Sequence, residues 1–476
     1  MKKIRVSKRK IKIGFSGLIC KTDENILDFA YSPKAYNFTF RNGALKGDIG
    51  VDEAKGYYGD SMQLRHTYPA FPEGTEIYDV LPYMRIVGDV RDDRLVVRTN
   101  ANKLFYTKIF ENDTWHEIVG DPISGRICSV NYNYAGEDVL IISSDSCAMR
   151  ILAGEKLTTI PLAPKFTSLA VHFERVYGTV NNKNEVWFSD DFNPTNWKVD
   201  GTAAGYIKFN DEYGGVLKVI SFLNYLYIFR EHAIFRLTAY ANQAEFTLNK
   251  LFTETGRIYK PTIAQCGDKI LFMAEEGLFS FDGYSVTRIG KELPPNYTPF
   301  TAVAAYQNNC YYLACKIVEP LFDIGVAVNN MLIEYNLEEK TIAVLAPLDI
   351  LSLVPVNIRQ ATDLIVLLQK NVRNKFGMLS DSGKIFGVET KKMYFSPYNS
   401  LGDDSVKTVR SVTLMTKNPC LLKVKIDGVE SQHQLFGSEF PQTVFVERCG
   451  QKIGFEIETT AANAHISQVV ATIETR

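Results

Sequence analysis

Few side chains in this sequence stand in a pattern that could do chemistry, and the clearest set lies just after an apolar run. Its members alternate with other residues: Ser189, Asp191, Asn193, Thr195 and Trp197. Hydroxyl, carboxylate and amide oxygens at this spacing accept hydrogen bonds from nearby backbone N–H groups, so the pattern is typical of the capped tip of a β-hairpin. A carboxylate here could act as an acid or base only if a second reactive group converged on it.

Other reactive residue types are dispersed. Asp403 and Asp404 share a polar loop with no His or third carboxylate near them. The six His and eight Cys residues form no metal-binding spacing, and no phosphate loop, GxSxG or HExxH is present. We therefore expect no enzyme activity, no cofactor and no metal, and we expect the cysteines to be free thiols of a reducing compartment.

The elements that would position any site are β-strands. Hydrophobic residues make up 46% of the 476 residues and aromatic residues 12%, with abundant Val, Ile and Thr, a mixture that suits pleated sheets. Between residues 77 and 390 an apolar strand recurs about every 40–50 residues, which is the period of a four-stranded propeller blade. The sequence predicts an all-β chain with a β-propeller of about seven blades, six being the alternative, and two stacked β-sandwiches are the competing architecture.

Three parts are expected along the chain. Residues 1–60 would form an N-terminal arm and hairpin, 61–390 the β-propeller, and 391–476 a C-terminal antiparallel β-sandwich with a hairpin turn at Asp427-Gly428. Within the repeats, we expect a fourth strand at 197–199 and a third strand at 384–386.

The N-terminal arm alternates apolar and cationic residues, and seven of its first twelve residues are Lys or Arg. A period of two predicts a strand with one apolar and one basic face. The bland interpretation is a solvated arm; the functional one is an arm that contacts an acidic neighbour or nucleic-acid phosphates. The candidate contacts are Lys2, Lys3, Arg5, Lys8, Arg9 and Lys10.

The turn at residues 189–197 resembles a degenerate Asp-box, the S-x-D-x-G-x-T-W hairpin of sialidase-type propellers. The resemblance implies a structural role, in which Ser189 and Asp191 cap the turn and Trp197 packs between strands. Sialidase-like catalysis would also need three arginines, a Tyr nucleophile with a Glu partner and an Asp acid, and no motif marks such a set.

Three segments together resemble the β-propeller tail proteins of tailed bacteriophages, a class that includes packaged-DNA stabilisation proteins and tail-hub or nozzle proteins. They are YNFTFRNGALKGDIG (36–50), EVWFSDDFNPTNWKVDG (185–201) with the hairpin at 214–237, and MYFSPYNSLG…VKTVRSVTL (393–414). They follow the order of the family and span most of the chain. Tyr394-Phe395-Ser396 departs from the more usual Trp-x-Ser.

The resemblance implies a structural virion protein of the neck or tail, assembled in the host cytoplasm. It would form a homo-oligomeric ring around the DNA channel, contact portal, adaptor or tail ring proteins, and help to retain or conduct the genome. A net charge of −1 fits a channel along which double-stranded DNA slides without tight binding. No run of residues is long and apolar enough for a membrane helix, so no membrane insertion is expected. A carbohydrate- or receptor-binding propeller and a sialidase-like glycosidase are the alternatives.

Overall fold

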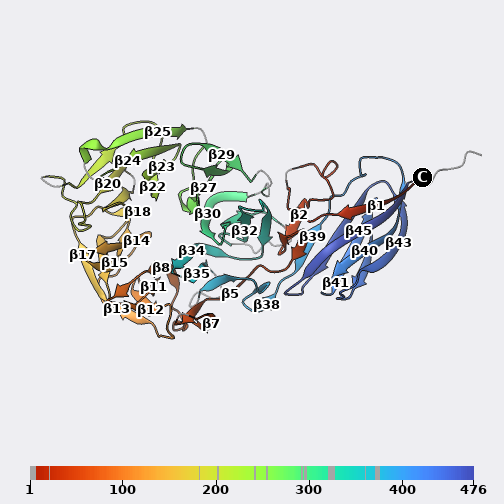
Figure 1. Ribbon diagram of the computed structural model, residues 1–476, viewed down its shortest axis with the longest axis horizontal. Coiled ribbons are helices and arrows are strands. Elements are labelled where there is room, and N and C mark those ends of the chain that lie inside the picture. Colours follow the sequence, from red (N-terminus) through yellow and green to blue (C-terminus); the bar gives the residue numbers. More distant parts are fainter. Residues whose placement is uncertain are drawn as a thin grey trace, which may run out of the picture.

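The computed structural model shows an all-β chain, as the sequence predicts (Figure 1). It describes residues 7–20, 22–59, 61–181, 183–200, 203–240, 243–253, 256–290, 293, 297–319, 327–359, 361–369 and 376–475. Within these ranges the helical elements are two short 3₁₀ turns, η1 (Gln243–Glu245) and η2 (Lys260–Thr262). No helix in this part of the chain is long and apolar enough to cross a membrane. All eight cysteines are free thiols.

Six antiparallel sheets follow one another along the chain, each of four strands. In chain order their strands are β8 (Ile77–Tyr83), β11 (Arg94–Thr99), β12 (Leu104–Lys108), β13 (His116–Ile118); β14 (Ile127–Tyr134), β15 (Glu137–Ser144), β16 (Met149–Ala153), β17 (Lys156–Ile160); β18 (Phe166–His172), β19 (Arg175–Val180), β20 (Glu185–Phe188), β21 (Gly205–Lys208); β22 (Val216–Phe222), β23 (Tyr225–Arg230), β24 (Ala233–Thr238), β25 (Thr247–Thr253); β26 (Ala264–Cys266), β27 (Lys269–Ala274), β28 (Gly277–Phe281), β29 (Val286–Ile289); and β30 (Tyr297–Gln307), β31 (Cys310–Ile317), β32 (Met331–Asn336), β33 (Ile342–Leu345). Two small hairpins, β6 (Lys55–Tyr58) with β7 (Ser61–Thr67) and β9 (Ile86–Val87) with β10 (Val90–Arg91), complete this part.

A seventh sheet joins the two ends of this series. Its order is β34 (Ile350–Ile358), β35 (Ala361–Leu368), β36 (Gly377–Ser380), β5 (Gly50–Glu53), β37 (Lys384–Ile385) and β38 (Val388–Glu389). Strand β5 comes from the beginning of the chain and pairs antiparallel with β36, with Gly377 opposite Glu53. An early strand thus completes the last sheet by hydrogen bonds, which ties the ends of the series together.

The seven sheets surround a common centre, and we call them together the ring (Figure 1). The first strands of neighbouring sheets contact one another, from β14 to β18 to β22 and from β26 to β30 to β34, and β34 contacts β8. The second strands lie buried between adjacent sheets, and every residue of β11 and β19 is buried. Strands covered on both faces read as continuous apolar runs, which is why the sequence marks them clearly.

Two of the strands expected from the sequence are wrong. Residues 197–199 form no strand, because the chain after β20 makes a long turn and returns only at β21. The third strand of the seventh sheet is β36 rather than 384–386, and β37 instead lies beside β5 in parallel.

Two further sheets lie beside the ring and contain the C-terminal strands. One has the order β3 (Thr39–Arg41), β4 (Ala44–Lys46), β45 (His465–Thr475), β40 (Lys407–Thr416) and β43 (Gln442–Gly450), and β1 (Ser7–Ile13) also pairs with β45. The other has the order β2 (Lys34–Tyr36), β39 (Lys392–Phe395), β44 (Ile453–Thr459), β41 (Cys420–Ile426) and β42 (Val429–Leu435). We call them together the two-sheet unit. Buried residues of both sheets, such as Val412 and Ile457, belong to one hydrophobic cluster.

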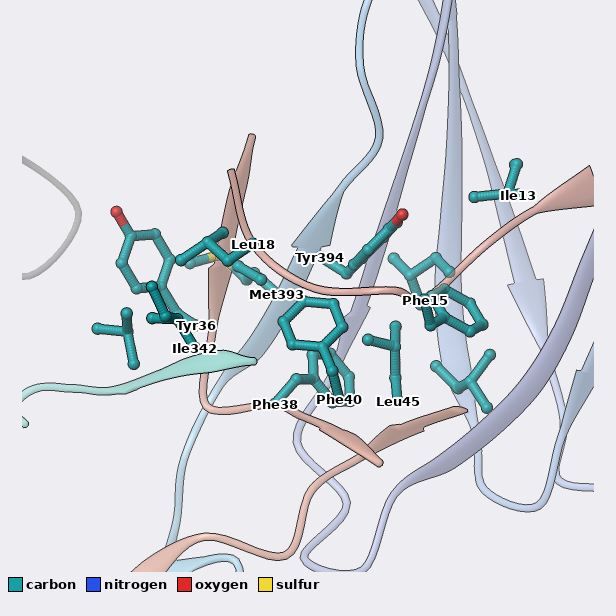
Figure 2. Packing of buried hydrophobic residues seen from close by; sticks show 14 of the residues in the cluster. Ile13, Phe15, Leu18, Tyr36, Phe38, Phe40, Leu45, Ile342, Met393 and Tyr394 are labelled. Atoms are coloured by element: carbon teal, nitrogen blue, oxygen red, sulfur yellow. The ribbon is translucent and has the colours of Figure 1, made fainter. Parts of the chain in front are cut away.

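The first 53 residues do not form a separate part: β1 to β4 belong to the two-sheet unit and β5 to the ring. Figure 2 shows Phe38 and Phe40 of this segment packed between Ile342 of the ring and Tyr394 of the two-sheet unit. Fully buried Asn37 reinforces the junction, since its side-chain N–H groups donate to the carbonyls of Ala346 (2.8 Å) and Lys391 (2.7 Å). The N-terminal segment therefore fastens the two-sheet unit to the ring.

Candidate interaction surfaces

The basic arm is a strand of the two-sheet unit over the residues that the structure describes. β1 pairs antiparallel with β45 from Ser7 opposite Thr475 to Ile13 opposite Val469. Ile11 and Ile13 are buried in the core, as the alternation predicts. The chain's own last strand holds this part of the arm, so no neighbouring molecule is needed to order it.

The cations of the arm face solvent. Lys8, Arg9 and Lys10 are exposed and form no ion pair with any described residue. Lys2, Lys3 and Arg5 lie outside the described residues. Arg9 is close enough to help lower the pKa of Asp403, although the hydroxyl and backbone N–H of Ser405 have the larger effect. The described cations are therefore available to a partner.

The sheet that contains β1 has two open edges. Among the described residues, β1 pairs only with β45 at one edge and β43 only with β40 at the other. Strands β1 and β45, β45 and β40, and β40 and β43 are all antiparallel, so β1 and β43 run in opposite directions. The N–H and C=O groups along an open edge are a template for pairing with another strand.

The β43 edge carries exposed aromatic rings, which we call the aromatic edge. Phe436, Phe440 and Phe445 have 72%, 77% and 74% of their surface exposed. The side-chain amide of Gln442 accepts the backbone N–H of Phe436 and donates to the carbonyl of the same residue. These two bonds hold Phe436 against the start of β43. Val444 faces the core while Phe445 points outward. Large exposed apolar rings of this kind are typical of surfaces that contact other molecules.

The turn at residues 189–197 uses its polar groups internally. The buried Ser189 hydroxyl accepts the N–H of Val176 (3.1 Å) and donates to the carbonyl of Asp190 (3.0 Å). Asp191 forms an ion pair of 2.6 Å with Arg175, a guanidinium that is only 1% exposed. These contacts hold the long connection between β20 and β21 against the start of β19.

Trp197 closes the same turn. Its indole N–H donates to the carbonyl of Pro194 (2.8 Å), and its ring is 2% exposed and lies 4.7 Å from the ring of Phe166. It thus belongs to the core between the second and third sheets. Ser189, Asp191 and Trp197 are all occupied in packing and turn geometry.

A hollow between the sixth and seventh sheets holds residue types that a glycosidase would use. Its volume is about 600 Å³ and its lining includes Arg41, Arg65, Tyr312, Glu334 and Asp363. The Tyr312 hydroxyl donates to Glu334 (3.1 Å), and Arg41 forms an ion pair of 2.7 Å with the same carboxylate. Burial raises the pKa of Glu334. Arg65 is likewise paired with Asp363 (2.9 Å), so both arginines are neutralised within the protein.

No group of three or more His, Cys, Asp and Glu side chains that could hold a metal ion occurs within the described ranges. In contrast, no pattern in the sequence marks the exposed aromatic rings. Phe436, Phe440 and Phe445 look in the sequence like ordinary strand residues, and only the order of the strands shows that nothing covers them.

Comparisons with known proteins identify no relative in sequence: no family model and no curated protein matches. Among solved structures, the computationally designed Ika8 protein is similar with a TM-score of 0.38 and 8% identity, over 65% of this chain and 100% of that chain. BBS1N, solved in complex with ARL6DN, is similar with a TM-score of 0.41 and 12% identity, over 64% of this chain and 94% of that chain. Neither likeness carries an argument about function.

Proposed function

We propose that this chain is a ring-forming structural protein of a bacteriophage neck or tail. In this proposal the seven sheets around the common centre are the blades of a β-propeller, and the two-sheet unit is a C-terminal β-sandwich. The strand order supports both assignments, because β5 closes the seventh sheet and the two further sheets share one buried cluster. The phage assignment rests on the three sequence segments that resemble the tail-protein family.

The observation that supports assembly of several copies into an oligomeric ring is the pair of open edges in the six-stranded sheet. Strand β1 of one copy can lie antiparallel against β43 of the next copy, so that the sheet continues from molecule to molecule. Such a head-to-tail contact uses two different surfaces of the chain. It produces an oligomeric ring when the rotation from each copy to the next adds up to a full circle. The aromatic edge would be covered in the assembly, which accounts for the exposure of Phe445 in the single chain.

The architecture suits a mechanical role. The ring is closed by β5, and the same N-terminal segment packs between ring and two-sheet unit. A force applied to the two-sheet unit would therefore reach the seven sheets through hydrogen-bonded strands and packed aromatic side chains. Contacts between the exposed cations of β1 and DNA in the channel are a second proposed use of Lys8, Arg9 and Lys10, and portal, adaptor or tail ring proteins are the proposed neighbours.

The hollow between the sixth and seventh sheets does not favour a glycosidase over this role. A sialidase-like site needs arginines free to bind a substrate carboxylate, whereas Arg41 and Arg65 each bind a carboxylate of the protein. The receptor-binding alternative would use clustered exposed aromatic rings at one face of the propeller. Exposed rings also occur on the seven sheets, where Phe173 and Tyr240 lie 5.6 Å apart, but Phe436, Phe440 and Phe445 belong to the two-sheet unit.

Immunogold electron microscopy of purified phage particles that encode this chain tests the proposal. We expect label at the junction of head and tail or along the tail, together with the intact chain in the mass spectrum of the particles. Particles that lack the chain, or label at the fibre tips alone, would contradict the proposal.

A further inference from the structure

Two hollows meet at the mouth of the ring. One, of about 670 Å³, is lined by residues of β18, β22 and β30 and by η2; the other, of about 650 Å³, is lined by residues of β8, β14, β30 and β34. Arg126 and Pro261 line both. Since first strands form the inner wall of the ring, the hollows lie at its centre, at the end where these strands begin.

The larger hollow is strongly cationic. Arg126, which also forms an ion pair of 3.0 Å with Asp145, lines it together with Lys183, Arg257 and Lys260, and Glu231 contributes the single carboxylate of the lining. That carboxylate is occupied, since it forms an ion pair of 3.0 Å with Arg257 and accepts the N–H of Gly215 (3.2 Å). A cleft lined by one sign of charge concentrates ions of the opposite sign.

Lys260 in the lining is near a second lysine, Lys218, which is buried behind the lining residues and does not line the hollow itself. The ammonium of Lys260 donates to the carbonyl of Thr167 (2.7 Å), and that of Lys218 donates to the carbonyl of Ile263 (2.6 Å). Burial is the main cause that lowers the pKa of each to about 8, and the nearby charges of Lys218 and Arg126 contribute to the lowered pKa of Lys260. The fold thus holds mutually repelling cations beside an open hollow, where a bound anion would relieve the repulsion.

An aromatic ring stands at the same hollow. Phe300 in β30 is 78% exposed, and its ring meets that of Tyr259 edge to face at 5.9 Å. A flat apolar surface beside cations is the combination on which nucleotides bind: the base stacks on the ring and the phosphate accepts hydrogen bonds from Lys and Arg.

We propose that this hollow binds a phosphate group attached to a flat aromatic ring, as in a free nucleotide or at the end of a nucleic-acid single strand. Arg126, Lys183 and Lys260 contact the phosphate, and Phe300 stacks on the ring. This site belongs to the ring mouth and does not depend on the two-sheet unit or on assembly.

Isothermal titration calorimetry with adenosine monophosphate, inorganic phosphate and adenosine tests this inference. We expect adenosine monophosphate to bind about tenfold more tightly than inorganic phosphate because of stacking. R126Q/K183Q removes two exposed cations and should weaken both phosphate ligands at least about tenfold. F300A should abolish the advantage of adenosine monophosphate and leave the binding of inorganic phosphate unchanged.

The matched control is K103Q/K391Q, which removes two exposed, ion-paired lysines elsewhere and should bind like the wild type. Free thymidine monophosphate and short oligothymidylates with and without a 5′-phosphate distinguish a nucleotide from a strand end. No heat from adenosine monophosphate at millimolar concentration, equal binding by R126Q/K183Q and the wild type, or equal losses in the control would each overturn the site.

Discussion

We expect deletion of residues 1–12 to abolish the association of copies without destabilising the seven sheets of each chain. The deletion removes β1 except for Ile13, and with it six register positions against β45 and the buried side chain of Ile11. Burial of one Ile contributes about 2 kcal/mol. The net gain from the strand hydrogen bonds, about 1 kcal/mol each, is largely offset by the entropy of ordering the backbone. We therefore expect a cost of about 2 kcal/mol, confined to the two-sheet unit.

The assays are hydrogen–deuterium exchange and sedimentation velocity on the wild type and the deletion. Exchange should increase in β45 and stay unchanged in buried ring strands such as β11 and β19, because no strand of the ring pairs with residues 7–12. The association of copies should be lost. The variant K8Q/R9Q/K10Q keeps strand β1 but removes three of its charges. It therefore tests whether association depends on these charges or on the backbone edge of the strand. Faster exchange throughout the ring, or unchanged association, would refute the reasoning.

Three further predictions concern single side chains. F445E should leave the thermal transition of the monomer unchanged and weaken association at least roughly 30-fold, about 2 kcal/mol, in equilibrium sedimentation. D191N should destabilise the chain by about 1–2 kcal/mol in urea unfolding, because Arg175 loses a charged partner; no change would show that the turn is not held by this pair. Burial lowers the pKa of Lys392 to about 8 from 10.5, so the unfolded chain binds more protons between these pH values and stability rises with pH in this window. K392M should reduce that slope by about 1.4 kcal/mol per pH unit, and an unaltered slope would contradict the lowered pKa.

The local parts of the fold could be predicted from the sequence. The second strands stand out because burial on both faces favours apolar runs, such as residues 95–97 in β11 and 226–229 in β23. The strand character of the arm follows from the alternation that places Ile11 and Ile13 in the core. Trp197 shows the limit of such patterns: an aromatic residue after a polar turn suggests a returning strand, yet its ring is buried from within a loop.

The long-range pairings could not be predicted. Strand β5 pairs with β36 more than three hundred residues later, and β1 pairs with the last strand of the chain. Neither pairing leaves a periodic signal, because a period reports which face of a strand is buried and not which strand lies beside it. The cations at the mouth of the ring, Arg126, Lys183 and Lys260, lie in connections next to different sheets and come together only when the sheets close around the centre.

The most direct test of the central claim is a cryo-electron microscopy map of the full chain assembled at high concentration or within the particle. We predict a closed oligomeric ring of several copies, in which β1 of each copy continues the sheet of its neighbour at β43 and Phe445 is covered at the contact. A chain that stays monomeric at every concentration and is absent from particles, or a ring whose contacts leave both edges exposed, would contradict it.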